Sequence, residues 1–128
     1  MTANRLAPGA KAIVVAVVTF VGSLALVACN PQRQQDCEKF VSVLKEIDQG
    51  SPSAATVDRV SRDIQALQLQ DQPLQIYASN FRDRLSVLSN TLRLNESPSP
   101  PDGTDQVIKE QLRGARTDSA DIQRYCSN

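Results

Sequence analysis

The hydrophobic residues of this chain form one continuous run near the N-terminus and four later segments with helical spacing. Steps of three and four residues place apolar side chains on one face of a helix. The first such segment lies between Gln32 and Gln49, and the sequence Gly50-Ser51-Pro52 ends it. Its apolar positions are Cys37, Phe40, Val41, Leu44 and Ile47.

The second periodic segment carries an apolar stripe and a charged opposite side. The stripe consists of Val57, Val60, Ile64 and Leu67. The charged side consists of Asp58, Arg59, Arg62 and Asp63. Either Ser51 or Ser53 can cap this predicted helix, since proline is tolerated in a first turn and serine is a favoured N-cap.

The third segment has the most regular pattern of the chain, a seven-residue rhythm kept for about three heptads. Asp71 and Pro73 mark its beginning. Its apolar positions are Leu74, Tyr77, Ala78, Phe81, Leu85, Leu88 and Leu92. The following residues, 95–103, contain too much proline for a helix or a ladder strand, and we predict a loop there.

The last predicted helix runs from about Thr104 to Tyr125, and a polar stretch from Thr117 to Asp121 interrupts its pattern. This interruption leaves open whether the helix is single and straight. Four helices with short connections favour antiparallel neighbours. The sequence therefore predicts an all-α fold, an antiparallel up-down-up-down four-helix bundle.

The continuous apolar run belongs to a typical export signal. Residues 1–11 carry Arg5 and Lys11 without any acid, and residues 12–28 are apolar apart from three small or polar positions. A basic stretch followed by an apolar one is the layout of a signal peptide. The alternative is an uncleaved membrane anchor, because a run of this length approaches the roughly 20 residues that span a bilayer.

The end of this run resembles the lipobox of bacterial lipoproteins. The matching residues are Leu26-Val27-Ala28-Cys29. The resemblance implies that residues 1–28 are a cleaved signal peptide, that Cys29 receives acyl chains such as palmitate, and that 29–34 form a lipidated tether. The predicted four-helix domain is then 35–128, exported and anchored to a membrane facing the periplasm or a lumen. Several acyl chains hold a protein on a bilayer where one does not.

Two cysteines are left for a disulfide. Cys37 lies near the start of the first helix and Cys126 near the end of the last, and these positions share one end of an up-down-up-down bundle. Disulfides persist in exported proteins. A bridge would close a loop of roughly 90 residues, for which chain entropy gives about 4–5 kcal/mol of stabilisation. We therefore predict that one disulfide staples the bundle.

The remaining composition argues against catalysis and against nucleic acid. The 14 basic and 14 acidic residues balance, and removal of Arg5 and Lys11 with the leader leaves 12 basic residues and a charge of −2. The chain has no His, so a serine nucleophile and a di-iron carboxylate site both lack a usual component. Carboxylates that could meet inside the bundle are Glu38, Glu46, Asp63 and Glu110. We predict a protein that is not an enzyme and holds no metal or cofactor.

One group of side chains is a candidate docking patch for a carboxylate or phosphate surface: Arg82, Arg84, Arg113 and Arg116. Ordinary solvated helix faces explain the same residues and are the commoner outcome. Aromatic residues could similarly line a pocket, although their helical spacing favours the core. These aromatic residues are Phe40, Tyr77, Phe81 and Tyr125.

The mature part resembles a group of small exported cyanobacterial helical proteins of uncharacterised function. The residues concerned are the segment Leu67-Gln68-Leu69-Gln70-Asp71-Gln72-Pro73-Leu74-Gln75-Ile76-Tyr77, then Phe81 and Tyr125-Cys126. The resemblance implies an architecture and a cell type but no activity. We expect a membrane-tethered, non-enzymatic binding or scaffolding module for an envelope or thylakoid protein. The alternative is a carrier of a small apolar ligand in the bundle core.

Overall fold

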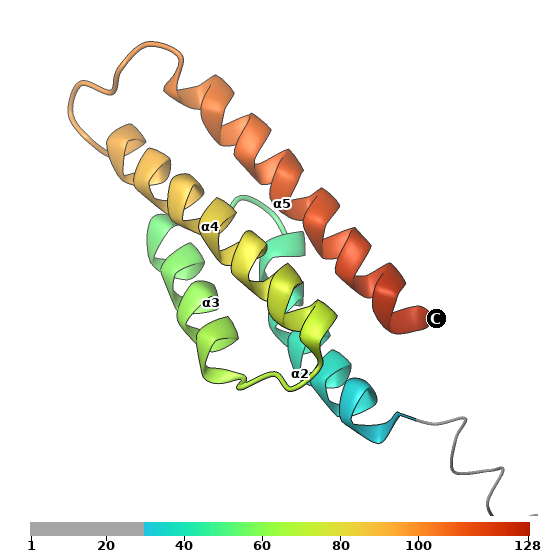
Figure 1. Ribbon diagram of the computed structural model, residues 1–128. Helices are drawn as coiled ribbons and strands as arrows, with labels where there is room; N and C mark the ends of the chain where they lie inside the picture. The colour runs from blue at the N-terminus through green and yellow to red at the C-terminus, as the bar shows by residue number, and fades with distance from the viewer. Residues whose placement is uncertain (1–29) are drawn as a thin grey trace, which may run out of the picture. The chain divides into compact units, whose positions relative to one another are not determined.

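The computed structural model describes residues 30–128, which form four α-helices (Figure 1). The predicted signal peptide and Cys29 lie outside the described residues. The helices are α2 (Pro31–Asp48), α3 (Ala54–Ala66), α4 (Gln72–Asn95) and α5 (Thr104–Ser127). They alternate in direction along the chain, which confirms the predicted antiparallel up-down-up-down bundle. Between residues 30 and 128, no helix is both long enough and apolar enough to cross a membrane.

The core consists of the apolar faces that the spacing predicts. Phe40 of α2 and Phe81 of α4 have no solvent exposure. The other apolar side chains with no exposure are Leu44, Ile47, Val57, Val60, Leu74, Leu85, Leu88, Ala115 and Ile122. Full burial of a large apolar side chain contributes about 1.5–3 kcal/mol, so this face of each helix holds the bundle together.

Local capping sets where two of the helices begin. The Ser53 hydroxyl accepts a hydrogen bond from the Thr56 amide at 3.2 Å, so Ser53 is the cap of α3. The Asp71 carboxylate accepts from the Leu74 amide, also at 3.2 Å, and caps α4. Each cap satisfies one of the amide groups that the first helical turn leaves without a partner.

α5 is one helix through its polar middle. Ser119 in this stretch has no exposure, and its hydroxyl donates to Asp48 Oδ2 of α2 at 3.2 Å. Ala115 and Ile122, one turn on either side, are also fully buried. The polar stretch is therefore a buried polar contact between α2 and α5.

α2 begins at Pro31, inside the segment 29–34 that the sequence analysis treats as a tether. Proline suits the first position of a helix because its missing amide proton would have no partner there. The helical domain therefore begins two positions after Cys29.

Candidate functional site

A disulfide joins Cys37 and Cys126, as the sequence predicts. The two Cα atoms are 5.6 Å apart, and 89 positions separate the residues along the chain. The bond links the beginning of α2 to the end of α5. Cys37 is buried and Cys126 packs against the core, so the bridge continues the apolar interior at this end of the bundle.

Beside the disulfide, Asp36 is a carboxylate with no solvent exposure. Its Oδ2 atom accepts hydrogen bonds from the backbone amides of Gln70 at 2.7 Å and Asp71 at 2.8 Å. Gln32 Nε2 donates to Oδ1 at 3.1 Å. Burial raises the pKa of Asp36, but the hydrogen bonds from Asp71, Gln70 and Gln32 outweigh it, and the net pKa is below the ordinary value.

Tyr125 completes the contacts at this end. Its hydroxyl donates to Asp71 Oδ2 at 2.8 Å, and its ring centroid lies 5.7 Å from that of Tyr77. The Arg33 guanidinium lies 4.3 Å above the Tyr125 ring and donates to the Tyr125 carbonyl. Burial and the hydrogen bond to Asp71 raise the pKa of Tyr125. Hydrogen-bond donors engage the carboxylates of both Asp36 and Asp71. We call the disulfide, Asp36, Asp71 and Tyr125 together the clasp, because these contacts hold this end of the bundle together.

The sequence analysis did not identify Asp36. The signal was present, because Asp36 precedes Phe40 and Leu44 by four and eight residues and so shares their face of α2. An acid on an apolar stripe requires hydrogen-bond donors from another part of the fold. Those donors are amides 34 and 35 positions away, which a periodic pattern does not identify.

The predicted arginine patch is divided between different surfaces. Arg84 Nε donates to Asp118 Oδ2 at 2.6 Å, so this side chain lies between α4 and α5. It passes close over Gly114, where an added Cβ atom would come within 2.3 Å of Arg84 Nη1. Arg82 Nη2 donates to Gln65 Oε1 of α3 at 3.1 Å. Of the four predicted residues, only Arg113 and Arg116 line a common surface.

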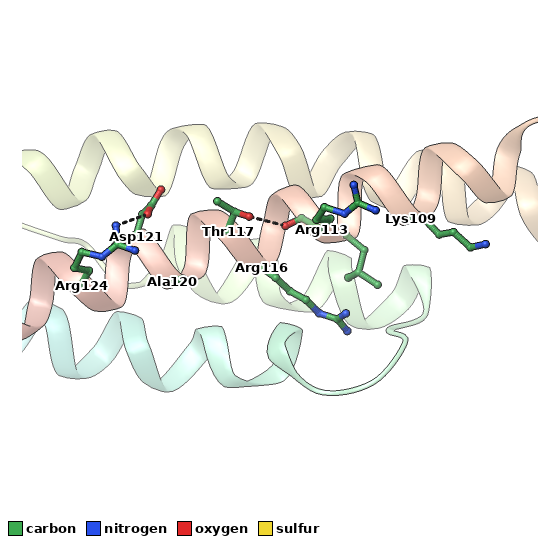
Figure 2. Close-up of a pocket in the computed structure, with 8 residues that line it drawn as sticks. Lys109, Arg113, Arg116, Thr117, Ala120, Asp121 and Arg124 are labelled. Atoms are coloured by element: carbon green, nitrogen blue, oxygen red, sulfur yellow. Dashed lines mark hydrogen bonds and ion pairs between the residues drawn. The ribbon is translucent and has the colours of Figure 1, made fainter.

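That common surface is a shallow pocket on the outer side of α5 (Figure 2). Its basic residues are Lys109, Arg113, Arg116 and Arg124, which we call the α5 cationic stripe. Leu112, Thr117, Ala120 and Asp121 are the other described residues that line it. The sequence analysis selected Arg113 and Arg116 but missed Lys109 and Arg124, although their spacing puts all four on one side of a helix.

The basic groups of the stripe differ in how far they are neutralised. Arg124 pairs with Asp121 at 3.0 Å. Arg116 donates to the Gly50 carbonyl at 2.5 Å, a contact that leaves its charge uncompensated. Within residues 30–128, the side chains of Lys109 and Arg113 have no ion pair. Three arginines on other faces form ion pairs: Arg59 with Glu46, Arg84 with Asp118 and Arg93 with Asp58.

A second unusual surface lies on α4, and it is apolar. Ile76, Val87 and Leu94 are 59%, 47% and 51% exposed. Spacings of eleven and seven residues correspond closely to whole helical turns, so the three side chains lie along one side of α4. We call them the α4 apolar line. The core-facing residues of α4 lie elsewhere on the helix and pack on α3 and α5.

Within the described residues 30–128, no cluster of three or more His, Cys, Asp or Glu side chains is placed to hold a metal ion. Comparison with protein-family models, with curated proteins and with solved structures finds no match for this chain.

Proposed function

We propose that the protein is a lipid-tethered, non-enzymatic binding or scaffolding module that holds an envelope or thylakoid protein through the α4 apolar line. The observation that carries the proposal is the alignment of Ile76, Val87 and Leu94, each about half exposed, along one side of a long helix. Exposed apolar side chains that share one surface are typical of protein interaction sites. A partner that covers them gains the hydrophobic free energy of their burial.

The bundle suits such a role because it presents α4 on a fixed base. The disulfide holds α2 to α5, and Asp36 holds α2 to the connection between α3 and α4. A surface that is already ordered loses little conformational entropy when a partner binds.

The tether supports the proposal by confining the domain to a membrane surface. The lipobox-like sequence Leu26-Val27-Ala28-Cys29 is its basis. A module held at a bilayer meets membrane-associated partners at a raised effective concentration. Intact mass spectrometry of the membrane-purified protein tests it: we expect loss of residues 1–28 and acyl mass on Cys29, and an unprocessed chain would contradict the tether.

Site-specific photocrosslinking in cells tests the partner surface. A photoreactive amino acid at Val87 should give a defined crosslinked protein, whereas the same probe at Glu38, an exposed position of α2, should not. Adding Leu94→Glu to the Val87 probe protein should abolish the crosslink, because it puts a charge into the apolar contact. Equal crosslinking from Val87 and Glu38, or persistence of the crosslink with Leu94→Glu, would contradict the proposal.

A carrier of a small apolar ligand is the second function that the sequence allows. It would require the core to open around residues such as Phe40 and Phe81, which have no exposure. No feature described above favours it over the binding module.

A further inference from the structure

All the basic side chains of α5 gather on one side of the helix. Lys109, Arg113, Arg116 and Arg124 line the same surface, at intervals of four, three and eight residues. The helix has equally many carboxylates, but only Asp121 is among the residues that line this surface. The chain as a whole has a formal net charge of +0, so α5 has a positive face that the composition does not reveal.

This positive face is long, straight and accessible. Lys109 and Arg124 are fifteen positions apart, which corresponds to about 22 Å of helix. All four basic residues of the stripe are exposed. Figure 2 shows Arg124 at one end of the row and Lys109 at the other, with Arg113 and Arg116 between them.

We propose that the α5 cationic stripe docks the domain on anionic phospholipid headgroups of the bilayer that carries its lipid anchor. The inference rests on the proposed tether and is independent of the proposed protein partner. It adds a second contact with the membrane, which would lay α5 along the surface and leave the domain with a fixed orientation.

The chemistry of the stripe fits headgroup phosphates. Guanidinium groups bind phosphate oxygens through paired hydrogen bonds, and an ammonium group attracts them as a point charge. Lipids move laterally, so their phosphates adapt to cations spaced along a single helix. An acidic protein would need carboxylates fixed at matching intervals. Each Lys or Arg close to an anionic bilayer strengthens binding by about fivefold, so the three basic residues of the stripe that have no carboxylate partner in the described part of the chain are a substantial addition to an acyl anchor.

The position of the stripe also fits an anchored domain. Arg124 lies two residues before Cys126, whose disulfide leads to Cys37 near the start of α2. The helix α2 begins two residues after Cys29, the expected site of the lipid. The stripe therefore begins at the end of the bundle where the tether joins. A tethered surface binds as an intramolecular event, so weak individual contacts suffice.

The lysines of the domain provide a direct test on the purified, lipidated protein. It is reconstituted into vesicles of phosphatidylcholine alone or of phosphatidylcholine mixed with anionic phosphatidylglycerol. A water-soluble acylating reagent then labels Lys109 in the stripe and Lys45, an exposed reference on α2. We expect Lys109 labelling to slow several-fold relative to Lys45 in the anionic vesicles only, and high salt to remove the difference.

A charge-reversal pair tests the same surface by another readout. The variant K109E/R113E reverses the charge of two residues of the stripe that have no ion pair among the described residues. The control variant K45E/R62E reverses two exposed basic residues, one on α2 and one on α3, and changes the net charge of the protein by the same amount. An environment-sensitive amino acid at Ala120 reports quenching by spin-labelled headgroups. Quenching in anionic vesicles should persist in the control pair and be lost in K109E/R113E.

Two results would overturn the inference. One is equal Lys109 labelling in neutral and anionic vesicles. The other is protection of Lys109 in native membranes but not in protein-free lipid, which would assign the stripe to an acidic protein. Flotation of the vesicles in a density gradient separates the two proposals. If the protein floats with neither kind of vesicle, the tether and with it the proposed function are contradicted. If the protein floats with both kinds while Lys109 stays reactive, only the docking of the α5 cationic stripe is contradicted.

Discussion

Asp36 is a fully buried carboxylate whose strongest contacts are neutral amides rather than a bonded cation. A carboxylate offers only acceptors, and the amides of Gln70 and Asp71 are donors that precede the first turn of α4. The field of a helix N-terminus also favours negative charge at this place. One side chain of α2 therefore holds in place the two residues that precede α4, whose first turn Asp71 caps.

Asp36→Asn should destabilise the protein by about 2 kcal/mol, because the neutral amide oxygen of Asn accepts from the Gln70 and Asp71 amides less strongly than a carboxylate does, and its amide nitrogen cannot accept from Gln32. Urea unfolding of the disulfide-intact protein measures this change. The control is Glu38→Gln, which removes an exposed carboxylate of the same helix and should change stability little. Equal effects of the two substitutions would show that the hydrogen bonds of Asp36 contribute nothing specific.

The pKa of Asp36 gives the protein a predictable acid response. Its folded-state pKa lies below the ordinary value of 3.8, so its contribution to stability is present above that pH and is lost as the pH falls through the lower folded value. The free energy of unfolding should therefore decline in this acid range. The decline should be shallower in Asp36→Asn, and an unchanged slope would contradict the assignment.

At the scale of the helices, the end of α3 contains a residue in an unfavourable backbone conformation. α3 ends at Ala66, Leu67 is its C-cap, and Gln68 follows with φ of +52°. This left-handed position after a helix usually holds glycine, because a Cβ atom makes the conformation costly. The chain accepts this cost in order to turn from α3 into α4.

Gln68→Gly should stabilise the protein by about 0.5–1 kcal/mol, since relief of the left-handed strain exceeds the added entropy of the unfolded chain. Gln70→Gly is the matched control two residues later, where φ is not positive. That control keeps the amide that Asp36 needs and should lower stability. Thermal unfolding of both variants decides the matter, and destabilisation by Gln68→Gly would refute the strain argument.

The helices themselves follow from local pattern, whereas the clasp does not. The stripe from Leu74 to Leu92 predicts α4 because its spacing and its Asp71 cap agree. The polar middle of α5 left open whether this segment is one continuous helix. Ser119 in that stretch is buried against Asp48, a residue 71 positions away, and local pattern does not identify this contact. The sequence identified two of the four residues of the α5 cationic stripe, Arg113 and Arg116. The other two, Lys109 and Arg124, share their surface because of the helical geometry of α5.

At the scale of the whole molecule, two devices secure the end of the bundle where α2 begins. The disulfide ties α2 to α5, and Asp36 ties α2 to the residues before α4. In the chain-entropy model, a bridge that closes a loop of this size contributes about 4–5 kcal/mol. Reduction should therefore lower the urea midpoint substantially, and an unchanged midpoint would mean that the bridge does not stabilise the fold by restricting the unfolded chain.

The two devices should not act independently. In the oxidised protein the start of α2 cannot move away, so Asp36→Asn incurs the full cost of replacing the carboxylate's hydrogen bonds with the backbone amides by weaker ones. In the reduced protein the same end can fray and expose those amides to water, which limits the cost to that of local opening. Asp36→Asn should therefore destabilise the reduced protein by less than the oxidised one, with a difference of at least about 0.5 kcal/mol in a double cycle of mutation and reduction. Additive effects would mean that the clasp opens only when the whole bundle unfolds.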